Sequence, residues 1–364
     1  MAVGLVVVGL GNVGSSLLAG IEAARAHLVH PWGSLADAGG SARTPEYGGA
    51  EPLRARVPLA ELTELELGAF ELRDDNAYQA AMRAGLLDRS LLDELRPRLR
   101  QLRAMAGARQ APTRRHLADA LCEDLRGFLE HGGCQRGIVV CTAPGLRDVP
   151  GKPPLTAREL WSALEKSDVD VTPGLVYAAA AAQAGCAFVC AAHDAALQAP
   201  GLAALFAEAG LPVAGVGLLT PDVALREAVA QLLGAEALGL VGTTSLSTRV
   251  EERGARLWGG PDRTQEMGLA SAWAGGAFEL SIELRGQIAL HLAARALDAA
   301  LFVDLAARAG RSGAQDWMDA LFAAPILPDA PREAQPATLA ERRARMHAEL
   351  PLLAATARTG TAAA

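Results

Sequence analysis

The feature that most constrains this chain is a glycine-rich run close to its first residue. The apolar stretch Val3 to Val8 leads directly into Gly9-Leu10-Gly11-Asn12-Val13-Gly14, which has the spacing G-x-G-x-x-G. A helix-compatible segment, Ser15 to Arg25, follows at once. A strand, a tight glycine turn and a helix in that order are the context that a dinucleotide-binding turn requires.

Each glycine of this turn has a physical role. Gly9 allows the sharp turn, Gly11 lets the backbone approach a pyrophosphate, and Gly14 lets the helix pack closely on the strand. Free N–H groups and the positive dipole end at the start of the helix then bind phosphates. The run from Gly9 to Gly14, with Leu10, Asn12 and Val13 between the glycines, therefore predicts a nicotinamide or flavin dinucleotide site. A plain glycine turn is the alternative.

The composition narrows the class of protein. At 364 residues, with 51% hydrophobic and 21% charged residues, the chain is globular and long enough for two lobes. The net charge of −7 and the lack of a basic stripe argue against nucleic acid as a partner. No apolar run reaches the ~20 residues that a bilayer requires, so we expect a cytoplasmic protein with no membrane partner. The odd count of 5 cysteines argues against a disulfide framework, and their spacing predicts no metal site.

Helices and strands alternate along most of the chain. Short apolar strands are expected at Gly137–Thr142, Cys186–Cys190 and Pro212–Gly217, with helical segments between them. This alternation predicts an α/β fold, a doubly wound parallel sheet whose ligand crevice lies at the carboxyl ends of the strands. Thr142 and Ala143, just past one such end, are predicted to line a nicotinamide pocket through their backbone groups.

The last third of the chain is less regular. Residues 254–276 are glycine-rich without clear periodicity, whereas Phe278 to Leu284 alternates strictly and predicts a strand with one solvated face. A long alanine-rich helix is expected from Gln287 to Ala309. Beyond Pro325 the tail is Pro-rich, then charged, and its Ala/Thr end is expected to fray.

Several segments, taken together, resemble the myo-inositol-phosphate synthase family. Residues 9–16, GLGNVGSS, are similar to that family's G-x-G-x-N-G-S-T turn, and residues 67–72, LGAFEL, to its G-G-W-D-I segment. Residues 210–215 match the strand before its catalytic loop, and residues 273–276 and 278–305 resemble its C-terminal part. The likeness is collinear from residue 3 to about residue 325.

The resemblance implies an activity and a domain organisation. The implied reaction is NAD-dependent isomerisation of glucose 6-phosphate to inositol phosphate, within inositol and phospholipid biosynthesis. It proceeds by hydride removal, enolisation, aldol closure and hydride return. It also implies a homo-oligomer, a dimer or tetramer, and a ribose-binding role for Glu71. We expect a Rossmann-type NAD domain from residues 1–189 and 285–364, and an α+β substrate and oligomerisation domain from residues 190–284.

The sequence departs from this family where the family's catalytic lysines stand. Leu219 occupies the position of one lysine, and the whole chain has only two lysines among its 34 basic residues. Arg226 and Arg249 are expected to replace two others. An arginine binds phosphate well but is a poor proton donor. His193 and Asp194, which follow the strand expected at Cys186–Cys190, could perform acid–base work, although an ordinary loop role is the competing interpretation.

Three functions follow from this pattern. The first is a divergent NAD-dependent cyclase or isomerase of a sugar phosphate. The second is an NAD-dependent dehydrogenase or epimerase of a related polyol phosphate, which would not need the lost lysine. The third is a catalytically silent NAD-binding protein.

Overall fold

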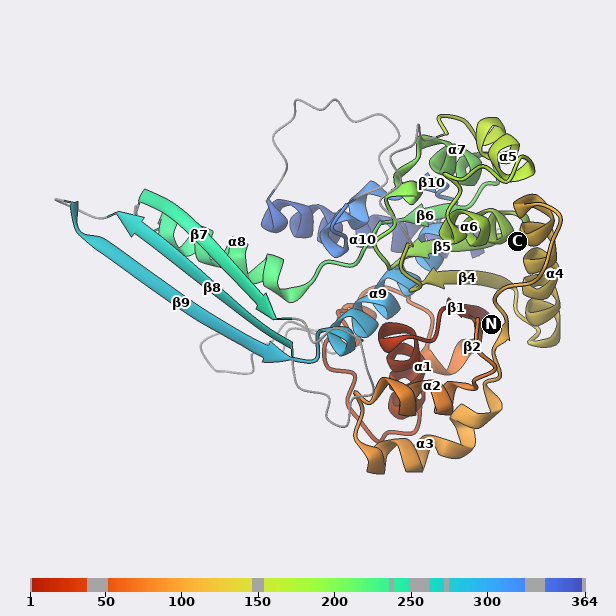
Figure 1. The fold of residues 1–364 in the computed structure, drawn as a ribbon, viewed down its shortest axis with the longest axis horizontal. Coiled ribbons are helices and arrows are strands. Elements are labelled where there is room, and N and C mark those ends of the chain that lie inside the picture. Colours follow the sequence, from red (N-terminus) through yellow and green to blue (C-terminus); the bar gives the residue numbers. More distant parts are fainter. Residues whose placement is uncertain are drawn as a thin grey trace.

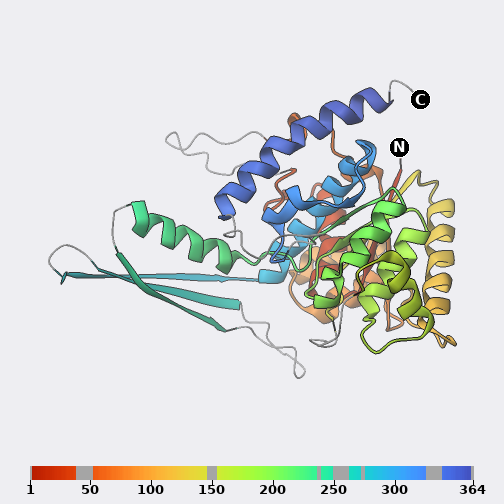
Figure 2. The same ribbon diagram turned by 90° about the horizontal axis from the view of Figure 1, so that it is seen from above.

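The computed structural model describes residues 2–37, 52–145, 154–235, 239–248, 262–271, 275–324 and 338–361. Within them the chain forms a large helix-flanked sheet and a smaller three-stranded sheet that extends away from it together with one helix (Figure 1). The view from above shows the same two parts, with the last helix lying across the large one (Figure 2).

The large sheet has seven strands in the order β10-β6-β5-β4-β1-β2-β3, and each paired strand is parallel to its neighbour. Their bounds are β1 Val3–Val8, β2 Leu65–Glu71, β3 Met105–Ala106, β4 Arg136–Cys141, β5 Cys186–Cys190, β6 Pro212–Ala214 and β10 Gly313–Ala314. The strand order reverses between β1 and β4, as in a doubly wound dinucleotide-binding sheet. The predicted α/β fold is confirmed.

The side chains of β1 divide between the two faces of the sheet, because successive residues of a strand point to opposite sides. Val3, Leu5 and Val7 join one buried cluster, and Val6 and Val8 join the other. The first cluster lies under α1 (Asn12–Arg25), α2 (Ala77–Ala84), α3 (Arg89–Gln101), α9 (Ile288–Arg308) and α10 (Leu339–Thr361). The second lies under α4 (Arg114–His131), α5 (Ala157–Glu165), α6 (Pro173–Gln183) and α7 (Pro200–Glu208).

The C-terminal tail differs from the prediction. Its Ala/Thr end was expected to fray, but the helix α10 runs from Leu339 through that end to Thr361. Leu339, Met346, Leu350 and Leu353 recur at helical spacing and are buried in the same cluster as α9. Arginines and glutamates between them, and a proline within the helix, conceal that apolar stripe in the sequence.

The smaller sheet is antiparallel and contains β7 (Gly239–Thr248), β8 (Asp262–Ser271) and β9 (Ala277–Gly286). Helix α8 (Pro221–Ala235) packs on it, with Val229 and Leu233 against Leu280 and Ile282 of β9. The strand predicted at Phe278–Leu284 is confirmed. The prediction of irregular structure across residues 254–276 is wrong for β8, whose glycine and polar residues give no apolar alternation to recognise.

The predicted domain boundaries, at residues 190 and 284, stay a prediction. Strand β6 pairs with β5 inside the seven-stranded sheet, and α7 packs in its second cluster. The segment that leaves the large sheet therefore begins at α8, and it returns at α9.

Candidate functional site

The glycine turn lies at the carboxyl end of β1, where the strand order reverses. Gly9 has a φ of +89° and its N–H donates to the carbonyl of Phe70 at 2.8 Å, which joins the turn to the end of β2. A Cβ on Gly14 would lie 2.1 Å from the Gly9 carbonyl oxygen and 2.8 Å from Thr142 Oγ1, so a side chain does not fit there. Close packing of the helix against the strand requires this glycine.

The next glycine faces open space. No atom lies within 4 Å of the position that a Cβ would take on Gly11, which is the N-cap of α1 and supplies no side-chain cap. The first N–H groups of a helix have no partner within it, so those of α1 are available to an anion. The cradle therefore fits a dinucleotide pyrophosphate.

Glu71 lies at the end of β2, where a dinucleotide-binding fold carries its ribose-binding acid. One carboxylate oxygen accepts a hydrogen bond from the Leu10 N–H at 2.7 Å. The other accepts from the N–H groups of Leu72, at 2.8 Å, and Arg73, at 3.3 Å. The structure therefore places Glu71 directly against the glycine turn, and its ribose-binding role stays a prediction.

Thr142 and Ala143 follow β4, which flanks β1 on the side opposite β2. Both N–H groups donate to the Val8 carbonyl, at 2.9 and 3.1 Å, and the Thr142 hydroxyl donates to the Gly9 carbonyl at 2.7 Å. These contacts brace the glycine turn. Asn12 and Val13, which open α1, are half-buried beside it.

His193 and Asp194 follow β5, and their side chains differ in environment. His193 is exposed, and its imidazole packs on Gly217, where a Cβ would lie 2.4 Å from Nδ1. Asp194 is 4% exposed; it accepts a hydrogen bond from the Thr172 hydroxyl at 2.7 Å and from the Ala196 N–H at 3.1 Å. The Asp194 carboxylate therefore caps the short 3-10 helix Ala195–Gln198 and is fixed by these two hydrogen bonds.

Two of the three positions that the resemblance aligns with lysines lie in the described residues. Leu219 is buried, at 8% exposure, in the segment between β6 and α8. Arg226 is exposed on α8. Arg249 lies outside the described residues.

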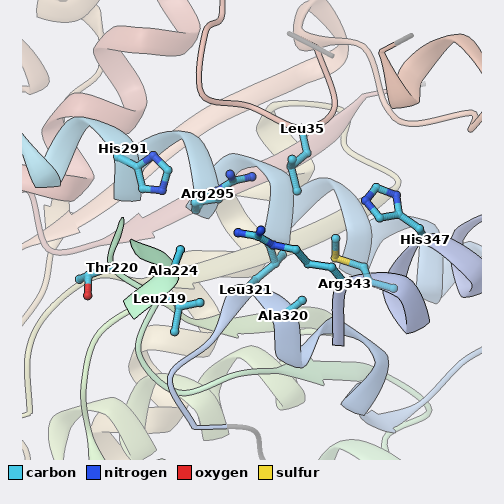
Figure 3. A pocket seen from close by; sticks show the side chains of 11 residues that line it. Leu35, Leu219, Thr220, Ala224, His291, Arg295, Ala320, Leu321, Arg343 and His347 are labelled. Carbon is cyan, nitrogen blue, oxygen red and sulfur yellow. The ribbon is translucent and has the colours of Figure 1, made fainter. Parts of the chain in front are cut away.

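A cavity of about 340 Å³ adjoins Leu219 and lies between α9, α10 and the start of α8. It brings together two arginines and two histidines, Arg295 and His291 from α9, and Arg343 and His347 from α10 (Figure 3). The remaining lining residues are Leu35, Leu219, Thr220, Ala224, Ala320, Leu321 and Met346. Figure 3 shows the guanidinium groups of Arg343 and Arg295 directed toward one another.

The charges at this cavity disfavour further positive charge. Burial, with Arg295 and Arg343 nearby, lowers the pKa of His291 to about 4, so its imidazole is neutral at pH 7. Burial and the neighbouring Arg56 and Arg343 also lower the pKa of His347. The pKa of Arg343 is lowered by burial and then by Arg295.

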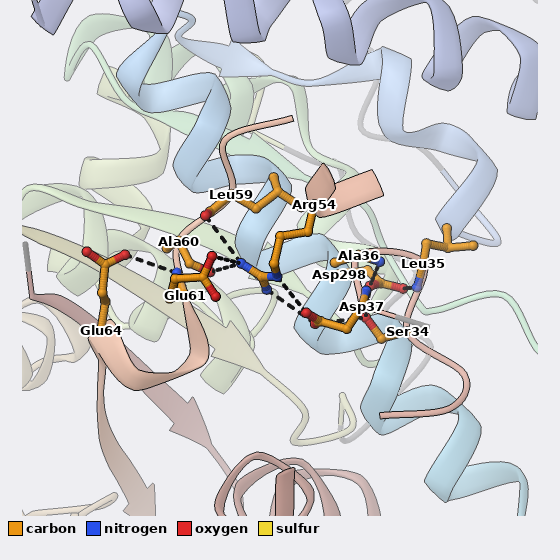
Figure 4. A network of polar contacts seen from close by, with 10 residues as sticks. All are labelled: Ser34, Leu35, Ala36, Asp37, Arg54, Leu59, Ala60, Glu61, Glu64 and Asp298. Carbon is orange, nitrogen blue, oxygen red and sulfur yellow. Dashed lines mark hydrogen bonds and ion pairs between the residues drawn. The ribbon is translucent and has the colours of Figure 1, made fainter. Parts of the chain in front are cut away.

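Asp298, a buried residue of α9, connects the cavity to the segment that follows α1. It is 0% exposed and accepts hydrogen bonds from the Ser34 hydroxyl at 2.7 Å and from the N–H groups of Leu35 and Ala36, at 2.9 and 3.1 Å (Figure 4). Arg295 pairs with the same carboxylate at 3.3 Å. Burial raises the pKa of Asp298, against the opposing effects of Arg295 and these hydrogen bonds. The network ties the segment after α1 to α9.

Sequence reasoning missed this cluster. None of these four residues was singled out as a candidate site residue, and residues after 325 were interpreted as a tail. A signal was present, since His291 and Arg295, and likewise Arg343 and His347, are four residues apart and so share one helix face. Only the packing of α10 on α9 brings the two pairs together.

Comparison with known families decides the relationship. Residues 3–341 match the family described as myo-inositol-1-phosphate synthase. The chain belongs to this family. The resemblance inferred from the glycine turn and the later segments is confirmed, and membership implies the use of NAD.

Curated relatives agree with this assignment. The chain is 23% identical over 385 aligned positions to inositol-3-phosphate synthase 1 of Bacteroides thetaiotaomicron, covering 89% of each chain. It is 27% identical to the inositol-3-phosphate synthase of Drosophila melanogaster over 51% of this chain and 39% of that protein.

Solved structures share the fold. An inositol-3-phosphate synthase from Caenorhabditis elegans superposes with a TM-score of 0.79 at 17% identity, covering 97% of this chain and 86% of that one. A myo-inositol-1-phosphate synthase-related protein from Thermotoga maritima gives 0.71 at 15% identity, covering 96% and 98%. Among the described residues, no helix combines the length and apolar character needed to cross a membrane.

Proposed function

We propose that this chain is an NAD-dependent isomerase or cyclase of a sugar phosphate such as glucose 6-phosphate, with an altered set of catalytic side chains. The observation that carries the proposal is the glycine turn braced by Glu71 and Thr142, in a chain whose family match spans residues 3–341. When bound, NAD would accept a hydride from the substrate and return it.

The chain's own residues have distinct tasks in this proposal. The amides at the start of α1 bind the pyrophosphate, and Glu71 accepts the ribose hydroxyls in the crevice beside Leu10. Thr142 and Ala143 wall the nicotinamide side. His193, exposed at the end of β5, is the proposed proton acceptor, and Asp194 fixes its loop. Arg226 and Arg249 are proposed to hold substrate charge.

The alternative is an NAD-dependent dehydrogenase or epimerase of a polyol phosphate, or a silent NAD-binding protein. Leu219 favours it, because a buried leucine stands where the resemblance places a catalytic lysine. A leucine neither donates a proton nor stabilises an oxyanion, so enolisation and aldol closure lack their usual groups. Hydride transfer alone would not need them.

One assay separates these functions. The purified protein is incubated with NAD and glucose 6-phosphate while inositol phosphate is followed by chromatography and NADH by absorbance. Inositol phosphate is the expected product. NADH without a cyclised product would support the dehydrogenase, and the absence of NAD binding by calorimetry would contradict all three functions.

The substitution Leu219→Lys tests the altered position directly. A lysine there restores a cation and a proton donor beside the cavity, so inositol phosphate formation should rise about 10-fold or more. Leu218→Lys, at the neighbouring buried position, is the matched control and should give no gain. Equal rates for Leu219→Lys and the unmodified chain would show that this position does not limit the reaction.

We also propose that the chain forms a cytoplasmic homo-oligomer, a dimer or tetramer, through the three-stranded sheet. Phe278 and Leu284 of β9 are exposed apolar side chains on the face that also carries Leu280 and Ile282, which supports a covered face. Sedimentation equilibrium tests this. A Phe278→Glu variant should shift the protein toward monomer, and a monomeric unmodified chain would contradict the proposal.

A further inference from the structure

The cavity between α9 and α10 concentrates positive charge without an acidic residue in its lining. Among its 11 described lining residues, two are arginines, two are histidines and none is Asp or Glu. The two arginines come from helices far apart in sequence, Arg295 from α9 and Arg343 from α10. Two guanidinium groups held close together repel each other, and an anion bound between them would offset that repulsion.

The two arginines differ in what already balances them. Arg295 pairs with the buried carboxylate of Asp298 at 3.3 Å. Arg343 forms no hydrogen bond or ion pair within the described parts of the chain. Glu227 favours the charged form of Arg343, and its carboxylate accepts hydrogen bonds from the N–H groups of Leu339 and Ala340 at the start of α10. No acidic residue lines the cavity itself, so its wall is positively charged.

We propose that Arg295 and Arg343 bind the phosphate of the sugar phosphate substrate in this cavity. A guanidinium matches the geometry of a phosphate oxygen pair and keeps its charge at neutral pH. The hydroxyl of Thr220 and the neutral imidazole of His291 line the same space and can donate further hydrogen bonds.

The position of the cavity connects it to the proposed reaction. Leu219 and Thr220 line it, and these residues lie in the segment between β6 and α8 that also holds Gly217 against His193. The inference rests on the proposed function for the identity of the sugar, while phosphate binding itself can be measured without turnover.

Calorimetry on the NAD-loaded full chain tests this assignment. Glucose 6-phosphate, inorganic phosphate and glucose are titrated in turn into the unmodified chain and into Arg295→Gln, Arg343→Gln and Arg343→Lys. Arg358→Gln is the control, because Arg358 lies on the exposed surface of the same helix α10 and does not line the cavity. Since Arg343 forms no hydrogen bond or ion pair with the described residues, its replacement should leave the thermal unfolding temperature unchanged.

We expect glucose 6-phosphate to bind more tightly than inorganic phosphate, and glucose not to bind. Each Gln variant should bind glucose 6-phosphate at least about 10-fold more weakly than the unmodified chain. The affinity of Arg343→Lys should lie in between, and that of Arg358→Gln should be unchanged. Inorganic phosphate that binds while glucose 6-phosphate does not would mark an ion site and overturn the assignment. Unchanged affinity in both Gln variants would also overturn it.

The two proposals can fail separately. If phosphate binding depends on both arginines but no turnover is detected, the phosphate site is supported and the isomerase activity is contradicted. Turnover that both Gln variants retain with an unchanged KM would leave the isomerase standing and contradict this site.

Discussion

The two sides of the candidate site are built in different ways. The dinucleotide side consists of backbone groups and glycines from a short stretch, residues 9–14, braced by Glu71 and Thr142. The cavity side consists of charged side chains on α9 and α10, helices that meet only in the folded protein. Backbone recognition tolerates little change of sequence, whereas a set of cations can be supplied from any element that packs nearby. Our proposal that arginines of α9 and α10 bind the substrate phosphate relies on this difference.

The largest expected effect comes from the anchor of the cavity side. Asp298→Ala removes an acceptor that serves Ser34, Leu35, Ala36 and Arg295 inside the protein. Leaving these donors without their partner should lower the free energy of unfolding by about 3 kcal/mol. Urea unfolding measures it. Asp298→Asn keeps an acceptor oxygen, so its free energy of unfolding should fall by less. Equal decreases for the two variants would contradict the role of these hydrogen bonds.

The next effect tests the dinucleotide side with three glycines of one region. Gly14→Ala forces a Cβ against the Gly9 carbonyl, so it should destabilise the protein by about 2 kcal/mol and abolish NAD binding. Gly11→Ala meets open space, so it should unfold normally yet bind NAD more weakly. Unfolding curves and calorimetry measure both.

Gly20→Ala, exposed within the same helix, is the control and should stabilise the protein by about 0.5–1 kcal/mol. Equal NAD affinity for Gly11→Ala and the unmodified chain would contradict the assignment of the pyrophosphate to this turn.

The smallest expected effect is the pH dependence of the cavity side. The pKa of His291 is about 4 in the folded chain, below its ordinary value of 6.5, because of burial and because Arg295 and Arg343 face it. The unfolded chain therefore takes up this proton first as the pH falls. The stability that the neutral imidazole contributes is complete above pH 6.5 and is lost progressively toward pH 4. The free energy of unfolding, measured across this pH range, should depend less on pH in His291→Gln than in the unmodified chain. His116→Gln, on the surface of α4, is the control and should keep the original pH dependence.

The sequence predicted the dinucleotide side well because its signal is local. Strand β1, the glycine turn and α1 are consecutive, and Glu71 was found through the resemblance of residues 67–72. The parallel sheet followed from apolar strands separated by helices. Strands β7 and β8 were not predicted, because they are stabilised by pairing with neighbouring strands and have no alternating apolar pattern in the sequence.

The cavity side could not be predicted, since its geometry is tertiary. Arg295 lies among alanines and Arg343 in a charged stretch, where either would usually be a solvated side chain. Helix α10 was missed for the same reason, because Leu339, Met346 and Leu350 gain their meaning only against α9. The roles of His193, Arg226 and Arg249 stay predictions.

The packing of α9 has a consequence for how the chain is made. This helix belongs to the same core cluster as Val3, Leu5 and Val7 of β1, although nearly the whole chain separates them in sequence. During synthesis the first strand leaves the ribosome long before the helix that covers it. A nascent chain that stops short of residue 288 would expose an apolar face of its sheet, so we expect folding to complete late and truncated chains to require chaperones.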